Sequence, residues 1–583
     1  MLEARYLRRN DEGVVVETPD ELLRRVSKAV SSAELQYGDA SSASMWEERF
    51  YEMLSTLRFL PNSPTLMNAG TPLGQLSACF VLPVKDSIED IFDAVKNMAL
   101  IQRTGGGTGF SFSKLRPKGS VVSSTGGESS GPVSFMKIFD SATENIKQGG
   151  RRRGANMGVL RVDHPDILEF TTAKLEEGEL RNFNLSVGIT DAFMDALETD
   201  AEYELKDPRS GDVSARISAK NVFKKIAECA WRTGDPGALF LDTINRSHPL
   251  RGLGEIESTN PCGEVPLLPY ESCNLASVNL SVMLRDNEAS LDWERLGEAV
   301  RYGVRFLDDV IDVNRFPVRE TAEMTKSNRK IGLGVMGFAE MLIKLGISYN
   351  SAEAADFAEK LMSFIYDEAF RASAELARER SVFPNWEKSV YAERGVRLRN
   401  ATLTSIAPTG TISIIAGTTS GIEPLFGLAY ERKNVLRGET LYEINPLFLE
   451  YCMKSGINSR EFHERLMPEL IRTGRISDTE GVPEDLKRLF TTALEIPYGQ
   501  HIRIQAAFQK HVDNSVSKTV NMPESVSVAD VEKAYLDAYR LGCKGITVFR
   551  YGSRRQQVLE IGSDESAFEK EYFIKCDPGA CRL

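Results

Sequence analysis

Residues 77–103, SACFVLPVKDSIEDIFDAVKNMALIQR, combine the two local patterns from which the fold class can be predicted. Residues 77–82 form a short apolar run after a loop that is dense in turn formers, which predicts a β-strand. Residues 88–103 carry apolar side chains at helical spacing, which predicts an amphipathic helix. The same alternation of short apolar strands and amphipathic helices continues through most of the chain. It predicts βαβ units and therefore an α/β fold built on a parallel sheet or barrel.

The chain on either side of this alternating region has a different character. Residues 1 to about 60 read as helical, because Pro19 and the acidic residues after it mark a helix start and residues 46–60 have helical spacing. The last stretch is polar and lacks periodicity, which is typical of a flexible tail. We therefore expect a helical N-terminal region at 1–75, a catalytic domain at 76–552 and a tail at 553–583.

Composition bounds the class of protein and its compartment. The 583 residues are 42% hydrophobic and 26% charged, the balance of a soluble globular protein. No run approaches the ~18 apolar residues that a membrane span needs, and the N-terminus has no apolar signal segment. The formal net charge of −12 argues against a nucleic-acid binder that works by bulk charge. Eight cysteines are too few for a disulfide scaffold, so we expect a cytoplasmic protein without membrane or nucleic-acid partners.

Two glycine-rich segments are similar to nucleotide-binding motifs but lack their context. Residues 332–337 match GxGxxG, yet residues 323–330 before them are not a hydrophobic strand. We therefore interpret these glycines as small residues that allow close helix packing. Residues 105–109 lack the Gly-Lys-Ser/Thr ending of a P-loop, although their glycines would allow a backbone to approach a ligand closely.

Two further segments are candidates for anion binding. Residues 407–413, APTGTIS, place small hydroxyl residues and a glycine before the apolar Ile414, which suits either an anion site or a simple N-cap. Residues 148–154, QGGRRRG, form the one concentrated basic loop, with Lys147 just before it. Such a run is either a solvated face or a loop that contacts a ligand.

The sharpest constellation is NPCGE at residues 260–264, followed by Cys273. Proline and glycine bracket Cys262 in a turn, so we expect its sulfur at a loop tip. The carboxylate of Glu264 can act as a general base if it lies within hydrogen-bond reach of a substrate proton. Zinc binding is disfavoured because no CxxC pair occurs and the chain has only five histidines, so we expect no metal site.

The remaining cysteines fall into two groups. Cys576 and Cys581 lie near the C-terminus, where an exposed dithiol on a flexible arm suits thiol–disulfide exchange. Cys229, Cys452 and Cys543 lie in apolar settings, so we expect them in the core.

Together these motifs resemble those of the catalytic subunit of ribonucleotide reductases, and the resemblance covers nearly the whole chain. It rests on NPCGE at 260–264, Ser-Ala-Cys at 77–79, KQGGRRRGAN at 147–156, Pro-Thr-Gly-Thr at 408–411 and the C-terminal cysteine pair, in the family's order. The resemblance implies a ten-stranded α/β barrel of two parallel half-sheets with a central finger loop, preceded by a small helical N-terminal region.

The resemblance also implies radical chemistry at the NPCGE segment. Cys262 would become a transient thiyl radical that takes a hydrogen atom from ribose C3′. Glu264 would deprotonate the 3′-hydroxyl group, and Asn260 would hydrogen-bond the sugar.

Two cysteine pairs would supply the electrons in such an enzyme. Cys79 and Cys273 would deliver two electrons as C2′ loses water, and would end as a disulfide. Cys576 and Cys581 would reduce that disulfide by exchange and be reset by thioredoxin or a glutaredoxin-like donor.

The resemblance assigns ligand-binding roles to further residues. The ribose, diphosphate and base of a ribonucleoside diphosphate would be held by Ser63, Ala78, Gly107, Pro408, Thr409, Gly410, Thr411, Ile412, Gln148 and Arg152. A deoxynucleoside triphosphate effector at the interface of a homodimer would be held by Asp86, Ser87, Arg116 and Lys147. Because no ATP-cone sequence is found, we expect regulation of specificity without a general shut-off by dATP.

The source of the radical divides this family. The two-subunit (class I) type carries a Tyr-Tyr pair near its C-terminus, where this chain has Val548 and Phe549, and phenylalanine has no phenolic proton to transfer. Residues 542–550 and 500–514 resemble the adenosylcobalamin-dependent branch, so we expect adenosylcobalamin as the cofactor. The alternative is a class I large subunit that uses a separate metal radical subunit. A nucleotide sensor without chemistry and an NAD-linked oxidoreductase are both disfavoured by the complete set of cysteines.

Overall fold

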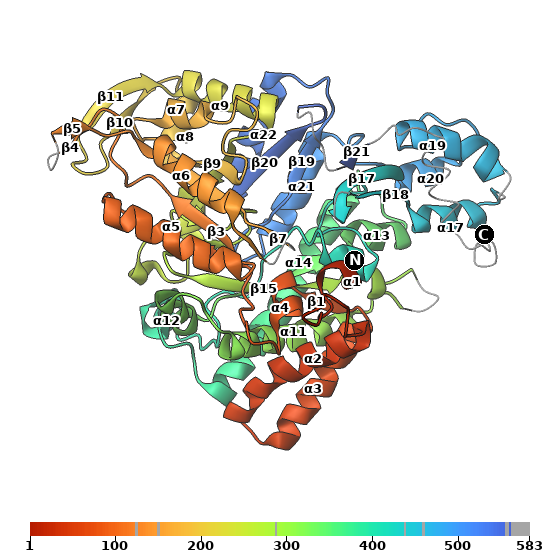
Figure 1. Ribbon diagram of the computed structural model, residues 1–583. Coiled ribbons are helices and arrows are strands. Elements are labelled where there is room, and N and C mark those ends of the chain that lie inside the picture. Colours follow the sequence, from red (N-terminus) through yellow and green to blue (C-terminus); the bar gives the residue numbers. More distant parts are fainter. Residues whose placement is uncertain are drawn as a thin grey trace.

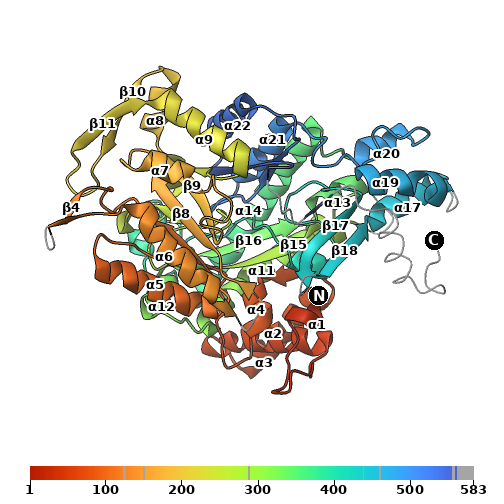
Figure 2. The same cartoon turned by 45° about the horizontal axis from the view of Figure 1, so that its top comes forward.

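The computed structural model describes residues 1–122, 126–148, 152–285, 289–436, 439–457, 461–553 and 559–560. Its centre is a 10-stranded sheet that curls into a barrel (Figures 1 and 2). The strand and the helix predicted within residues 77–103 are both present. Strand β2 (Cys79–Val81) lies within residues 77–82, and helix α5 covers Ile88–Arg103.

The first half of the barrel is a run of parallel strands. Each strand pairs in parallel with the next along the chain, and every central position in them is buried. They are β2, β3 (Gly107–Ser111), β8 (Asn156–Arg161), β9 (Phe183–Ile189) and β12 (Gly237–Phe240).

The second half runs the other way. Its strands are β15 (Ser272–Asn279), β16 (Ile331–Met336), β19 (Thr519–Met522) and β20 (Gly545–Arg550). Parallel bridges Leu333–Thr404 and Ile406–Val516 continue the ladder from β16 towards β19. The two halves meet antiparallel at β2–β15 and at β12–β20. This closes the sheet and confirms the predicted barrel of two parallel half-sheets.

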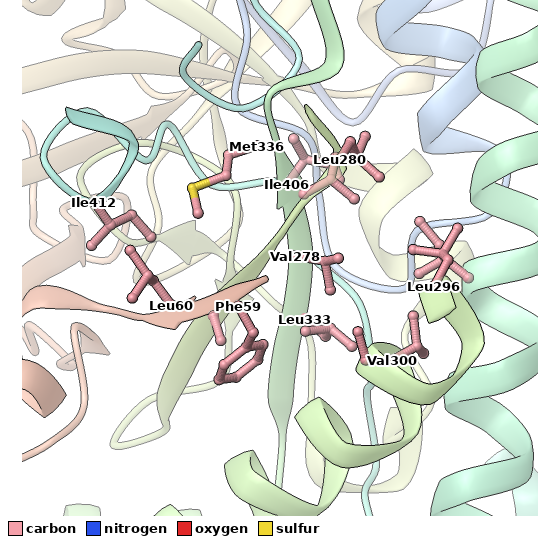
Figure 3. Close-up of a cluster of buried hydrophobic side chains, with 14 of the residues drawn as sticks. Phe59, Leu60, Val278, Leu280, Leu296, Val300, Leu333, Met336, Ile406 and Ile412 are labelled. Carbon is pink, nitrogen blue, oxygen red and sulfur yellow. The ribbon is translucent and has the colours of Figure 1, made fainter. Parts of the chain in front are cut away.

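Amphipathic helices cover the outside of the barrel, as the 3.6-residue periodicity predicts. They include α5, α6 (Pro132–Asn145), α9 (Ala219–Thr233), α11 (Trp293–Val313), α14 (Ala352–Arg380) and α22 (Val528–Arg540). Their apolar faces bury against the strands. In Figure 3, Val278 and Leu333 of the sheet lie beside Leu296 and Val300 of α11. Helix α21 (Tyr498–Gln509) differs from these helices, because it is buried along most of its length.

The N-terminal region is helical, as expected. Helix α2 (Pro19–Ser31) starts with a capping box between Thr18 and Glu21, and α3 (Ala40–Ser55) packs against it. The region is joined to the barrel by a buried carboxylate: Glu34 pairs with Arg305 of α11 and with Arg380 of α14, each at 2.6 Å. The N-terminal helices therefore share one core with the barrel.

Residues 425–490 build an additional unit with its own hydrophobic cluster, which sequence periodicity did not separate from the barrel. It holds β17 (Ala429–Leu436), β18 (Glu439–Ile444), α17 (Pro446–Lys454), α19 (Met467–Thr473) and α20 (Glu484–Leu489). Figure 1 shows its helices projecting to the right of the barrel.

The interpretation of residues 332–337 as helix packing is wrong. They lie in strand β16 and the turn after it, and helix α13 (Phe338–Lys344) begins only then. The glycines are needed because a loop crosses them: a Cβ on Gly334 would lie 2.2 Å from the backbone oxygen of Ser405. Among the described helices, none is both long and apolar enough to cross a bilayer.

Candidate active site

The NPCGE segment forms the tip of a hairpin inside the barrel. Its strands are β13 (Ser258–Thr259) and β14 (Pro266–Leu267), paired antiparallel. Gly263 takes the left-handed conformation with φ 82°, which favours glycine. Cys262 is exposed at the tip, whereas Glu264 is buried below it. This hairpin is the predicted finger loop.

Both halves of the barrel hold the finger in place. On the β3 side, a Cβ on Gly109 would lie 1.7 Å from the Thr259 oxygen, and a Cβ on Gly107 would lie 2.9 Å from Pro261 Cγ. On the other side, Ser405 Oγ donates to the backbone oxygen of Glu264 at 2.9 Å. Within the glycine-rich segment 105–109, Gly107 and Gly109 therefore leave room for the finger loop.

A cavity of about 290 Å³ lies against the finger. Its volume is near the low end of the range for small-molecule sites. The catalytic candidates Cys79, Asn260, Cys262 and Glu264 line it. So do the substrate-binding candidates Ser63, Ala78, Gly107, Pro408, Thr409, Gly410, Thr411 and Ile412. Residues brought from five separate parts of the sequence thus face one space. Of the two interpretations of residues 407–413, this placement favours ligand contact, since helix α16 (Ile412–Ala416) has no side-chain cap.

Cys79 and Cys273 face each other across the antiparallel junction of β2 and β15. Side chains at directly opposed positions have Cβ atoms about 4.5–5.5 Å apart, which is close to the spacing of a disulfide. Asn260 Nδ2 donates to Cys79 Sγ at 3.1 Å. Cys273 is fully buried behind Cys79 and does not line the cavity.

The surroundings of Cys273 favour its neutral thiol. Burial raises the pKa of this thiol well above its usual value, and the positive charge of Lys330 only partly offsets the effect. Lys330 itself is buried and pairs with Glu271 at 2.6 Å. Cys273 therefore rests as a neutral thiol.

A second cavity, of about 940 Å³, lies on the other side of Cys262. Pro261, Cys262 and Pro408 line both cavities, so the exposed sulfur stands between them. Strands β12 and β20 form part of its wall, and residues 423–427 at the start of the additional unit form another. Phe426 and Tyr430 contribute aromatic surface there.

The two segments similar to the cobalamin-dependent branch contribute unequally to this large cavity. Residues 545–549 of β20, including Val548 and Phe549, line it, and so does Gln505. His501 does not: it is buried in α21 beside the Ala493 oxygen at 3.0 Å, and burial holds its pKa well below the usual value. Within the described residues, no group of three or more His, Cys, Asp or Glu side chains is placed to hold a metal ion.

Three of the four effector candidates lie around the start of α5. Arg116 Nε pairs with Asp86 Oδ2 at 2.8 Å, and Ser87 caps the helix by accepting from the Asp90 amide at 3.0 Å. The nearby basic loop starts as a short hairpin, β6 (Lys147–Gln148) with β7 (Arg152–Arg153), in which Gln148 and Arg152 are directly opposed. Their backbone is described but not their side chains.

The remaining cysteines divide as follows. Cys229, Cys452 and Cys543 are buried in hydrophobic surroundings, as predicted. Cys576 and Cys581 lie outside the described residues.

The residues of the small cavity that sequence reasoning missed include three with polar side chains near the N-terminus, Arg5, Tyr6 and Asn62. Arg5 and Tyr6 belong to helix α1 (Leu2–Arg5) and the residue after it, in a stretch whose alternating charge gave no periodic signal. Asn62 is visible as the side chain before Ser63 and Pro64, a helix-start pattern, but such a pattern indicates a cap rather than a ligand.

The exposed Cys262 and the buried Glu264 thus line one cavity, and the opposed residues Cys79 and Cys273 lie at its wall and directly behind it. Comparison with known proteins gives the family. The profile described as "Ribonucleotide reductase, all-alpha domain" matches residues 1–74, and that described as "Ribonucleotide reductase, barrel domain" matches 77–397 and 393–549. The chain belongs to the ribonucleotide reductase family.

Individual relatives span most of the chain. A protein of Thermoplasma acidophilum named vitamin B12-dependent ribonucleoside-diphosphate reductase is 49% identical, over 98% of this chain and 81% of the relative. One of the same name from Mycobacterium tuberculosis is 51% identical, over 97% of this chain and 78% of the relative. The class Id ribonucleotide reductase alpha subunit of Actinobacillus ureae shares the fold, with a TM-score of 0.75 at 24% identity over 94% of this chain and 96% of that one.

Proposed function

We propose that this protein reduces ribonucleoside diphosphates to 2′-deoxyribonucleoside diphosphates, using a radical generated from adenosylcobalamin. One observation carries the proposal: the exposed sulfur of Cys262 stands between a small cavity backed by the Cys79–Cys273 pair and a larger cavity. The names of the two relatives near 50% identity support both the substrate class and the cofactor.

The radical step belongs to the finger loop. The Cys262 radical takes the hydrogen atom from C3′ of the ribose, and the Glu264 carboxylate accepts the proton of the 3′-hydroxyl group. Asn260 holds the sugar from the opposite side of the turn. Its amide also donates to Cys79, so one side chain couples the sugar to the reducing pair.

The reducing step belongs to the thiol pair. The C2′–O bond breaks and the oxygen leaves as water, taking a proton from Cys79, which lines the cavity. Cys79 and Cys273 together give up two hydrogens and form one S–S bond, and C2′ gains a C–H bond. Cys262 then returns its hydrogen atom to C3′, which restores the radical. Cys576 and Cys581 reduce the new disulfide by exchange and are reset by thioredoxin or a similar dithiol.

The large cavity is the candidate site for the cofactor because it lies against Cys262. Its volume of about 940 Å³ is at the upper end of the range for small-molecule sites, and Cys262 lines it. When bound there, adenosylcobalamin supplies the radical that oxidises Cys262. Residues 545–549 and Gln505 would contact it. The class I alternative is less well supported, because Phe549 stands where that type needs a tyrosine and because a Neurospora crassa large chain is only 28% identical.

Effector binding and dimerisation are proposed for the outer face of α5. Ile88 and Phe92 are exposed there, with 58% and 50% of their surfaces accessible, next to the Asp86–Arg116 pair. Exposed apolar residues grouped on one face mark an interaction surface. A second copy of the chain would cover them, with a deoxynucleoside triphosphate held between the copies by Asp86, Ser87, Arg116 and Lys147, and with Gln148 and Arg152 relaying its identity to the substrate base.

An anaerobic assay with CDP, adenosylcobalamin and a thioredoxin system tests the proposal. We expect dCDP, together with 5′-deoxyadenosine or cob(II)alamin during turnover. Cys262→Ser should abolish product, whereas Cys229→Ala, a buried change outside both cavities, should not. Product formed only with a separate metal-containing subunit would favour the class I alternative. Product formed by the Cys262→Ser variant would refute the radical role.

A further inference from the structure

The small cavity is bordered on one side by the first residues of the chain. Helix α1, labelled in Figure 1, ends at Arg5 and is followed by Tyr6. Both residues line the cavity. Among the described lining residues, Arg5 is the only one with a positive charge and Glu264 the only one with a carboxylate. Arg5 is therefore the described lining residue that can offer a positive charge to phosphate oxygens.

The position of Arg5 is fixed by its neighbours. Tyr6 is only 2% exposed, and its hydroxyl oxygen lies 2.7 Å from Ser63 Oγ. Leu7 is buried in the same core as the barrel strands. The guanidinium is therefore carried on a docked segment.

Asn62 adds an unused donor beside it. Its Oδ1 accepts from the Thr65 amide at 3.0 Å and from Thr65 Oγ1 at 3.2 Å, which fixes the orientation of the amide. Its Nδ2 is buried and makes no hydrogen bond, although the side chain lines the cavity and the residue is only 8% exposed. Leaving a buried donor unsatisfied costs about 1–3 kcal/mol, so this group is best explained by an acceptor on a ligand.

We propose that Arg5 and Asn62 bind the diphosphate group of the substrate, and that the N-terminal region is thereby part of the substrate site. Arginine offers a planar fork of donors that matches phosphate oxygens, and the Asn62 amide adds a neutral donor. The proposal rests on the proposed function for the identity of the substrate. It also explains how a protein with a net charge of −12 binds an anion. Arg5 at the edge of the cavity supplies a local positive charge, so no basic surface patch is needed.

The test compares Arg5→Gln and Arg5→Lys with Arg8→Gln, a matched change at an exposed arginine three residues on that does not line the cavity. CDP and cytidine binding are measured by calorimetry, and KM and kcat for CDP are measured in the holoenzyme. Arg5→Gln should weaken CDP binding and raise KM about tenfold or more, because a charge-assisted hydrogen bond is lost, while cytidine binding and kcat change little. Arg5→Lys should restore part of the effect, and Arg8→Gln should behave as wild type.

Asn62→Asp supplies an independent arm. The carboxylate keeps the cap on Thr65, since aspartate is as good a cap as asparagine, but it places a negative oxygen where Nδ2 stood. CDP binding should fall by about tenfold or more with the thermal midpoint unchanged. The proposal is overturned if Arg5→Gln leaves CDP binding intact, or if it weakens CDP and cytidine equally. Because binding is measured without turnover, a wild-type protein that binds CDP but makes no dCDP would count against the proposed function and leave this inference standing.

Discussion

Cys79 and Cys273 occupy directly opposed positions on strands that come from the two halves of the barrel. The junction of β2 with β15 is antiparallel, whereas strands within each half are parallel, and opposed side chains approach most closely in antiparallel pairs. The barrel's closure therefore places the two thiols together. Only Cys79 reaches the cavity, so the pair has an outer and an inner member.

This arrangement predicts which cysteines are oxidised during turnover. Turnover of a Cys576→Ser/Cys581→Ser variant with CDP and no external reductant should yield a disulfide between Cys79 and Cys273, because the C-terminal thiols can no longer exchange with it. Peptide mapping under non-reducing conditions detects this disulfide. Cys273→Ser should stop multiple turnover, because Cys79 then lacks a partner. The buried Cys452, in the additional unit, serves as an internal control and should remain a free thiol. Product formation that leaves both Cys79 and Cys273 free would contradict the prediction.

The approach of the finger to β3 predicts a steric requirement at Gly109. Gly109→Ala would place a methyl group 1.7 Å from the Thr259 oxygen, so the finger must move. Overpacking of this kind costs about 1–3 kcal/mol, and displacing Cys262 should reduce kcat by more than tenfold. Chemical denaturation and steady-state kinetics measure both effects.

Gly499→Ala is the matched control, since nothing lies within 4 Å of a Cβ there and the residue is in helix α21. It should leave kcat unchanged and stabilise the protein by up to about 1 kcal/mol. Equal activity of the Gly109→Ala and Gly499→Ala variants would show that the finger tolerates displacement.

Local pattern was enough to predict the elements of the barrel. Residues 88–103 and the long helix near 354–380 have clear helical periodicity, and they form α5 and α14. The cysteine turn was also predictable, because Pro261 and Gly263 restrict the backbone locally. Roles for Cys79 and Cys273 came only with the family resemblance, since nothing in their spacing indicates that they meet.

Contacts between residues that are far apart in the sequence could not be predicted in the same way. Position 334 requires glycine because the backbone of Ser405 packs directly against it. Ser405 is 71 residues away in sequence, so no local pattern indicates this contact. The unit at 425–490 has ordinary amphipathic helices, so periodicity alone does not reveal that they share a separate core. Arg5 became a candidate only when folding brought α1 to the cavity.

A buried ion pair cluster predicts how strongly the N-terminal helices are fixed to the barrel. Burial works to raise the pKa of Glu34, but the hydrogen bond and charges of Arg305 and Arg380 outweigh it and hold that pKa below its usual value. The stabilisation is therefore present above about pH 4.5 and is lost as the pH falls through the lowered pKa. Glu34→Gln should reduce the free energy of unfolding by about 3 kcal/mol at pH 7, because it leaves buried guanidinium groups less well paired.

Glu484→Gln provides the comparison, since Glu484 pairs with Lys487 on the surface and is 86% exposed. Its effect should be below about 1 kcal/mol, and both variants can be followed by urea denaturation. If Glu34→Gln also changes stability by less than about 1 kcal/mol, the cluster does not anchor the region.

The last prediction concerns a buried lysine behind the finger. Lys544 Nζ donates to the backbone oxygens of Asp513 and Asn514, each at 2.5 Å, and burial lowers its pKa to about 8. An unfolded lysine has a pKa of about 10.4, so between about pH 8 and pH 10.4 the unfolded chain binds more protons than the folded one. Stability therefore rises with pH across this window, by up to about 3 kcal/mol, and this gain is progressively lost as the pH falls from about 10.4 to about 8.

Lys544→Gln keeps a donor for the two carbonyl oxygens but removes the titration. The stability of this variant relative to wild type should therefore be greater at pH 7 than at pH 10. Urea denaturation at the two pH values measures the difference. Lys220→Gln, at a lysine whose side chain is 67% exposed, should show the same difference from wild type at both. A difference between Lys544→Gln and wild type that does not depend on pH would contradict the prediction. It would mean that the ammonium group keeps its ordinary affinity for protons although the residue is only 5% exposed. The carbonyl oxygens of Asp513 and Asn514 would then fully replace water around it.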